Sequence, residues 1–212
     1  MRPVDKAARN GENYSPYGSA KDDLFTAIGG YCSYCERQGH SSAIDVEHIK
    51  NKDDYPELTE EWENFLLACK NCNSIKGKKD FQFDEIILPH LNNTFTPFDY
   101  KSGGLIQVKA SLENSERSKA QALVDLIGLL RRPGSDRYSV KDKRWQERLE
   151  TWNKAERYLQ KFSEGHADLE AVCDLAKSCG FWSVWMTVFK DHLDVKQALI
   201  EKFSGTNSSY FS

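Results

Sequence analysis

The sequence predicts an α+β protein, in which a cysteine-rich half with short strands precedes a mainly helical half. Two C-x-x-C pairs, at 32–35 and 69–72, enclose a β-prone segment over 43–49. A second extended segment, over 96–110, contains a Gly pair that suits a hairpin turn. Farther along the chain, apolar residues recur at helical spacing instead. With 212 residues, of which 39% are apolar, the chain is long enough to form a hydrophobic core.

The first half is predicted to hold short elements between loops. Residues 1–20 are polar and indicate an arm without a core of its own. A short helix is expected over 22–28, ending at two glycines, and the alternating segment over 43–49 is expected to be a strand. Residues 50–60 are typical of a loop, and a short helix is predicted over 73–79.

The second half is predicted to be helical after the hairpin. Apolar residues spaced over 123–130 indicate a helix that ends at Pro133-Gly134. Over 145–162 the apolar residues step by three or four, which is typical of a long amphipathic helix. Two or three shorter helices are expected over 167–203, and the small, polar tail after Gly205 is expected to be frayed.

Composition suggests two regions, 1–95 and 96–212, with a boundary near residue 95. The net charge of −3 excludes a strongly basic protein, but residues 131–161 carry a net of +5. A polyanion would therefore meet the second region most easily, although a solvated helix face also explains such a run. The aromatic stretch 181–189 is apolar on most sides, which indicates burial in this chain or against a partner.

Four of the six cysteines predict a structural zinc site. No apolar leader and no membrane-length apolar run are present in the sequence, so we expect a cytoplasmic protein without membrane contact. Thiols stay reduced there, and paired cysteines then indicate a metal rather than disulfides. Two C-x-x-C pairs complete the tetrahedral set that zinc prefers: Cys32, Cys35, Cys69 and Cys72.

Glu47 and His48 predict a second, catalytic site between the cysteine pairs. Hydrolysis of a phosphodiester needs a cation that neutralises charge and a base that deprotonates water. A carboxylate ligand beside an imidazole that is neutral near pH 7 meets both needs. The stretch then continues with W-E-N at 62–64 and with C-K-N-C-N-S-I-K at 69–76.

These motifs resemble the HNH endonuclease family, whose core is a β-hairpin and a helix around one divalent ion. The resemblance implies a zinc-stapled ββα-metal core over about residues 25–80. It implies that His48 is the general base, that Glu47 and Asn73 are ligands of Mg²⁺ or Mn²⁺, and that Asn64 orients the segment bearing the base. Glu47 stands where the family usually has Asp, and Asn73 where it has His; both keep an oxygen ligand for a hard cation.

Simpler interpretations of these residues stay open at this stage. Asn64 also suits a turn, and Asn73 also suits the cap of a helix. Lys76 and Lys79 are expected to contact substrate phosphates, but a solvated charge run has the same composition. His90 is isolated and is interpreted as structural, with a place in the active site as the alternative.

A wider resemblance, to the HNH nucleases of Septu-type and retron-linked anti-phage systems, rests on outer segments of the chain: G-Y-C-S-Y-C-E-R, P-H-L-N-N-T-F, K-D-K-R-W-Q-E-R and G-F-W-S-V-W-M-T-V-F. It implies an effector nuclease acting on DNA or RNA, with DNA favoured. It also implies a partner ATPase of the PtuA type and, for retron-linked members, a retron nucleic acid–protein complex. The alternative is a zinc-ribbon nucleic-acid-binding or regulatory subunit without catalysis. For the nuclease, the basic residues expected to follow a nucleic-acid backbone are Arg131, Arg132, Lys143, Arg144 and Arg148.

Overall fold

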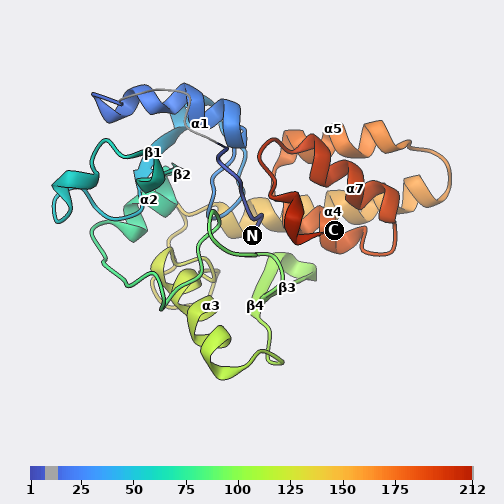
Figure 1. The fold of residues 1–212 in the computed structure, drawn as a ribbon. Helices are drawn as coiled ribbons and strands as arrows, with labels where there is room; N and C mark the ends of the chain where they lie inside the picture. Colours follow the sequence, from blue (N-terminus) through green and yellow to red (C-terminus); the bar gives the residue numbers. More distant parts are fainter. Residues whose placement is uncertain (8–13, 212) are drawn as a thin grey trace.

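The computed structural model describes residues 1–7 and 14–211, and it confirms the predicted α+β class. Within these residues, two antiparallel hairpins and seven α-helices pack around one hydrophobic core. The cysteine-rich elements lie on one side of the molecule, and the helices of the last third lie on the other (Figure 1). The core extends across position 95, because buried side chains from both sides of that position belong to one cluster.

The first hairpin and the helix that follows it form a ββα unit. Strand β1 (Ile44–His48) pairs antiparallel with β2 (Phe65–Cys69), and α2 (Lys70–Lys76) begins directly after β2. Helix α1 (Lys21–Ile28) packs against β2 and ends at Gly29, whose φ of 73° favours glycine. The uniformly apolar run of β2 has no alternation that would identify it as a strand, because both of its faces are buried.

Helix α2 begins three residues before the predicted start at Asn73. The cap residue is Cys69, and Asn73 therefore lies inside the helix. The interpretation of Asn73 as a helix cap is wrong, and its side chain is available for other contacts. The helix is only seven residues long and ends at Gly77, which has a φ of 52°.

The second hairpin consists of β3 (Phe98–Lys101) and β4 (Leu105–Val108), as the sequence predicts. Helix α3 (Asn114–Leu126) follows but ends several residues before the predicted stop at Pro133. The chain leaves the helix at Gly128, where φ is 56° and where a Cβ would lie 2.6 Å from the side chain of Arg131.

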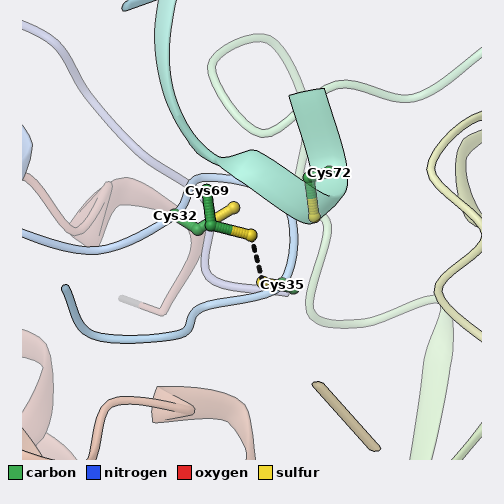
Figure 2. A group of neighbouring side chains, drawn as sticks. All are labelled: Cys32, Cys35, Cys69 and Cys72. Carbon is green, nitrogen blue, oxygen red and sulfur yellow. Dashed lines mark hydrogen bonds between the residues drawn. The ribbon is translucent and has the colours of Figure 1, made fainter. Parts of the chain in front are cut away.

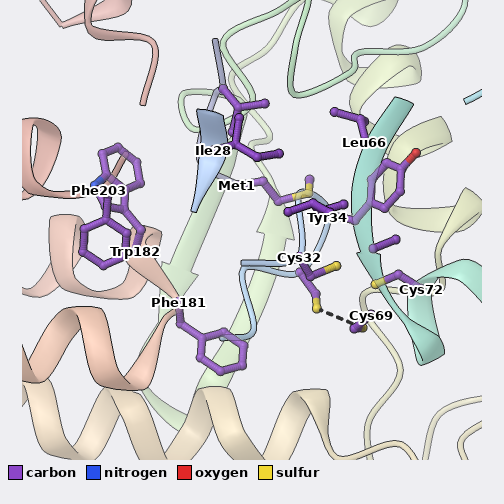
Figure 3. Close-up of a cluster of buried hydrophobic side chains, with 14 of the residues drawn as sticks. Met1, Ile28, Cys32, Tyr34, Leu66, Cys69, Cys72, Phe181, Trp182 and Phe203 are labelled. Carbon is purple, nitrogen blue, oxygen red and sulfur yellow. Dashed lines mark hydrogen bonds between the residues drawn. The ribbon is translucent and has the colours of Figure 1, made fainter. Parts of the chain in front are cut away.

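The long helix α4 (Arg144–Ser163) matches its prediction and joins the two sides of the molecule. Its later turns pack against α5 (Leu169–Cys179) and α6 (Trp182–Val188), and α7 (Leu193–Lys202) completes the group. Helix α6 contains the aromatic stretch and is buried within the chain, so these side chains are core and not an exposed docking surface. Figure 3 shows Phe181 and Trp182 in the core with Cys32 and Tyr34.

Both ends of the described chain pack onto the fold, in contrast to the predicted arm and frayed tail. Val4 donates its N–H to the carbonyl of Pro89 at 2.7 Å and forms a β-bridge with Thr206. The ring of Phe211 packs against Trp182, with ring centroids 5.5 Å apart. Part of the predicted arm, residues 8–13, lies outside the described residues. Both predictions missed these contacts because the partners are distant in sequence.

Among residues 1–7 and 14–211, no helix combines the length and apolar character that a membrane crossing requires.

Candidate active site and metal centre

The four predicted cysteines come together as one buried cluster (Figure 2). Their Sγ atoms all lie within 4.8 Å of one another, and all four are free thiols. The Sγ atoms of Cys35 and Cys69 are 3.6 Å apart. In a tetrahedral site with zinc–sulfur bonds of about 2.3 Å, the sulfurs would be about 3.8 Å apart. The donor set and its dimensions therefore fit a structural zinc ion.

Local chain geometry brings the two pairs together. Cys32 and Cys35 lie in a tight turn after α1, in which the N–H of Glu36 donates to the carbonyl of Cys32 at 2.8 Å. Cys69 ends β2 and precedes α2, while Cys72 lies in the first turn of that helix. Zinc at this position would fasten the turn to the start of α2, which also carries Asn73.

A cavity of about 220 Å³ lies beside strand β1 and helix α2. Three of the predicted catalytic residues line it, namely Glu47, His48 and Asn73, together with the predicted phosphate ligand Lys76. Strand β1 and helix α2 thus contribute to a single cavity. The remaining lining residues come from the arm and from the loops: Tyr17, Asn51, Lys52, Asp53, Gly77 and Lys78, with Val46 from β1.

His48 is held in one orientation by its neighbours. Its Nε2 lies 3.0 Å from the carbonyl oxygen of Thr59. A carbonyl can only accept, so Nε2 carries the hydrogen and the neutral ring has its lone pair on Nδ1. The rings of Tyr17 and Phe65 pack edge-on against the imidazole, with centroids 4.6 and 5.3 Å away. Burial lowers the pKa of His48 below 6.5, which keeps the ring neutral at pH 7.

Asn64 ties together the loop that positions His48. Its Oδ1 accepts the N–H of Lys50 at 2.7 Å, and its Nδ2 donates to the carbonyls of Lys50 and Leu58 at 2.9 and 3.1 Å. Lys50 follows His48 by two residues, and Leu58 precedes the Thr59 that accepts from the imidazole. The side chain of Asn64 therefore joins a residue close to His48 with the residue next to Thr59, and its role in orienting the base stays a prediction.

Glu47 forms a buried ion pair with Lys76. The Oε1 atom of Glu47 lies 2.7 Å from Nζ of Lys76, and both side chains are almost fully buried. The same Nζ donates to the carbonyl of His48 at 2.8 Å. Burial raises the pKa of the Glu47 carboxyl, and the charge of Lys76 opposes that rise. Lys76 is thus bound to the carboxylate and to the strand that carries the candidate base.

Asn73 is oriented by Asp45, a residue that the sequence interpretation missed. Nδ2 of Asn73 lies 3.5 Å from Oδ2 of Asp45. Asp45 precedes Glu47 by two residues, so both carboxylates leave the same face of β1. Within the described residues, the cysteines form the only cluster of three or more His, Cys, Asp or Glu ligands. This face of β1 therefore offers fewer carboxylate ligands than a metal site built entirely from Asp and Glu side chains would have.

Two predicted residues lie away from the cavity lining. Lys79 donates to the carbonyl of Leu126 at 2.9 Å, which joins the end of α2 to the end of α3. His90 is mostly buried, and burial lowers its pKa to about 3. Neither residue is among those that line the cavity. The prediction that Arg144 and Arg148 follow a nucleic-acid backbone is wrong, because both side chains are only 2% exposed.

Comparison with known proteins identifies the unit that holds both sites. The family model for HNH endonucleases matches residues 32–79, from the first cysteine of the cluster to three residues past the end of α2. Residues 32–79 are an HNH endonuclease domain. The resemblance found in the motifs is thereby confirmed for this part of the chain. The HNH domain contains the cysteine cluster and every cavity-lining residue except Tyr17.

Two curated proteins are similar to the chain. One is the Septu protein PtuB of Bacillus thuringiensis, 39% identical in an alignment over 74 residues that covers 32% of this chain and 29% of that protein. The other is the retron Vc95 putative HNH endonuclease of Vibrio cholerae serotype O1 biovar El Tor. It is 28% identical in an alignment over 119 residues that covers 51% of this chain and 56% of that protein. The similarity thus spans under a third of one relative's length and about half of the other's.

The residues around the HNH domain's cavity that sequence reasoning missed fall into two kinds. Asp45 was detectable, because strand alternation places it beside Glu47. Tyr17, Lys52 and Thr59 gave no signal, since each acts through contacts that depend on the folded chain. Nζ of Lys52 lies 4.7 Å from the centroid of the Tyr17 ring, and that ring in turn packs on His48.

Proposed function

We propose that the chain is a metal-dependent endonuclease that hydrolyses phosphodiester bonds of nucleic acid, with DNA favoured over RNA. The observation that carries this proposal is the orientation of His48. Its Nε2 hydrogen is directed to the carbonyl of Thr59, which leaves Nδ1 as a proton acceptor in a ring whose pKa is lowered by burial. A water molecule deprotonated there would attack the phosphorus atom.

A divalent cation, Mg²⁺ or Mn²⁺, fits the oxygen atoms of Glu47 and Asn73. Carboxylate and carboxamide oxygens suit such hard cations, and both residues line the cavity. When bound, the ion would neutralise charge on the phosphate and on the leaving oxygen. Lys76 would then hold Glu47 and the carbonyl of His48 in place. Its side chain is only 1% exposed, so we assign it a positioning role instead of the phosphate contact predicted from the sequence.

Exposed cations near the cavity supply contacts for the nucleic-acid backbone. Lys52 and Lys78 line the cavity itself. Lys79 adjoins the loop after α3, whose Arg131 and Arg137 bring further positive charge towards it. Among the described residues, the guanidinium groups of Arg131, Arg132 and Arg137 form no ion pair. Such unpaired side chains are available for phosphates.

The test compares wild type with His48→Gln in cells that also express a PtuA-type ATPase, the partner that the resemblance implies. Gln keeps a donor for the Thr59 carbonyl but has no group that accepts a proton near pH 7. Sequencing of cleaved DNA and RNA ends should reveal ends that are lost in the variant. A general base contributes about 10²- to 10⁴-fold, so a loss in that range is expected in vitro. Ends that persist in the variant would contradict the proposed role of His48.

A competing candidate is a zinc-ribbon binding or regulatory subunit without catalysis. The Glu47–Lys76 ion pair favours it, because the ammonium group already neutralises the carboxylate that would bind a cation. Titration with Mn²⁺, followed by electron paramagnetic resonance, separates the two candidates. The nuclease predicts saturable binding that Glu47→Gln weakens, whereas the regulatory subunit predicts no binding and full biological activity in His48→Gln.

We infer a role in anti-phage defence with an ATPase partner of the PtuA type, supported by the similarity to a Septu protein and to a retron protein. A retron nucleic acid–protein complex is a further candidate partner. Because the side chains of α6 are buried, the partner must bind elsewhere than the aromatic stretch. Co-purification of a tagged chain with the ATPase would test this inference.

A further inference from the structure

The first residue of helix α4, Arg144, contacts the cysteine cluster from outside the HNH domain. Its Nη1 donates to Sγ of Cys72 at 3.2 Å, and both side chains are fully buried. The two residues are 72 positions apart in the sequence. A thiolate that receives a hydrogen bond is a weaker nucleophile and a better-oriented metal ligand, so such donors influence how long a metal stays bound.

The guanidinium group of Arg144 is held in a single orientation. Its Nε and Nη2 donate to the two carboxylate oxygens of Asp142 at 2.9 and 2.6 Å. Nη1 also donates to the carbonyl of Ile127 at 2.9 Å, and Nη2 donates to that of Gly128 at 3.1 Å. Asp142 balances the charge, so Arg144 offers a directed N–H to the sulfur rather than a free positive charge. A lysine cannot reproduce this planar arrangement.

Two more contacts hold the first cysteine turn against the C-terminal helices. Nε of Arg37 lies 2.5 Å from Oε2 of Glu147, one turn along α4 from Arg144. The carboxylate of Glu36 accepts the hydroxyl of Ser183, on α6, at 2.6 Å. Residues that follow the Cys35 ligand are thus attached to two helices that lie beyond the matched family segment.

We propose that Arg144 is an outer-shell positioning residue of the zinc centre, and that through it zinc binding is coupled to the docking of α4 on the HNH domain. The four cysteines supply the metal ligands, and α4 supplies the N–H donor to Cys72. The centre is therefore shared between the HNH domain and the helical region. This proposal concerns metal retention, and it holds or fails independently of nuclease activity.

The test measures zinc release from the purified full chain to a chromogenic chelator, at a temperature where circular dichroism shows every variant folded. Arg144→Lys should release zinc roughly 10- to 100-fold faster, the range for loss of an outer-shell partner. Arg157→Gln, an exposed arginine on the same helix, should leave the rate unchanged. If Arg144→Lys does not fold, Asp142→Asn takes its place, because it frees the guanidinium group without deleting the donor.

A cobalt-substituted sample separates the hydrogen bond from general loosening of the structure. The thiolate-to-cobalt absorption band should shift in Arg144→Lys and stay unchanged in Glu147→Gln, which breaks the Arg37 contact of α4 but not the Cys72 contact. An unshifted band, or release rates equal to wild type in the Arg144 and Asp142 variants, would overturn the proposal. If Glu147→Gln releases zinc as fast as Arg144→Lys does, and its band is not shifted, the role of Arg144 is merely structural.

Discussion

The cysteine cluster and the cavity of Glu47, His48 and Asn73 share the short helix α2, yet they are held in different ways. The cysteines are buried on all sides and are backed by an arginine whose donors are all satisfied. The cavity instead depends on loop contacts and on two ion pairs, Glu47–Lys76 and Asp53–Lys78, and its lining includes exposed lysines. Retention of a metal needs closed, saturated surroundings, whereas turnover needs an accessible position with an unused proton acceptor. The two sites meet these opposite needs within one ββα unit.

The largest expected effect comes from Cys69→Ser. Cys69 ends β2, caps α2 and belongs to the cysteine cluster. Structural zinc contributes about 10–16 kcal/mol in zinc-finger peptides, which equals or exceeds the total stability of a typical domain, about 5–15 kcal/mol. We expect loss of zinc, by elemental analysis, and loss of cooperative thermal unfolding.

Cys173→Ser is the matched control, because Cys173 is also buried but lies on α5 and outside the cluster. It should keep the zinc content of the wild type. A folded, zinc-loaded Cys69→Ser protein would mean that the cluster does not hold the fold together.

A smaller effect is expected from Asn64→Ala, which changes the loop beside the cavity and not the cysteine cluster. The substitution removes the partner of the N–H and carbonyl of Lys50, whereas the carbonyl of Leu58 still accepts the N–H of Glu61 at 3.4 Å. Each unsatisfied buried group costs about 1–3 kcal/mol. Thermal unfolding should move to lower temperature, and nuclease activity should fall, while the zinc content stays that of the wild type. Zinc loss at the temperature of the assay would show that the two sites are not separable in this way.

The smallest expected effect is a shift in pH dependence. Burial lowers the pKa of His48, so the base stays neutral below pH 6.5 and activity should decline on the acid side only as the pH falls through that lowered value. Tyr17→Ala uncovers the imidazole, and its pKa should rise towards 6.5. The acid limb of the kcat/KM profile should then move to higher pH. Tyr17→Phe keeps the ring and should leave the limb in place; equal shifts in both variants would rule out packing as the cause.

The sequence was sufficient wherever function depends on residues close together along the chain. The C-x-x-C pairs, the Glu47-His48 step and the long amphipathic helix could all be recognised locally, and the structure brings Glu47, His48 and Asn73 to one cavity. The HNH resemblance supplied what periodicity could not, since the apolar run of β2 fits a strand or a buried helix equally well.

Contacts between distant parts of the chain were beyond prediction. Arg144 is a typical exposed residue by composition, and only the fold places it against Cys72. Likewise, the early start of α2 could not be read from Asn73, because a good capping residue also serves inside a helix when its amide has another partner, here Asp45. Buried polar residues with remote partners account for most of the corrections.

The shortness of α2 has a consequence for how the molecule fails. Seven residues at about 1.5 Å each make a rod of roughly 10 Å, which is too short to bend. Cys72 and Asn73 are consecutive on it, so a displacement of Cys72 would also displace Asn73 at the cavity. Oxidation of a cluster thiol would therefore disturb the cysteine cluster and the cavity together, because the same rigid helix carries Cys72 and Asn73.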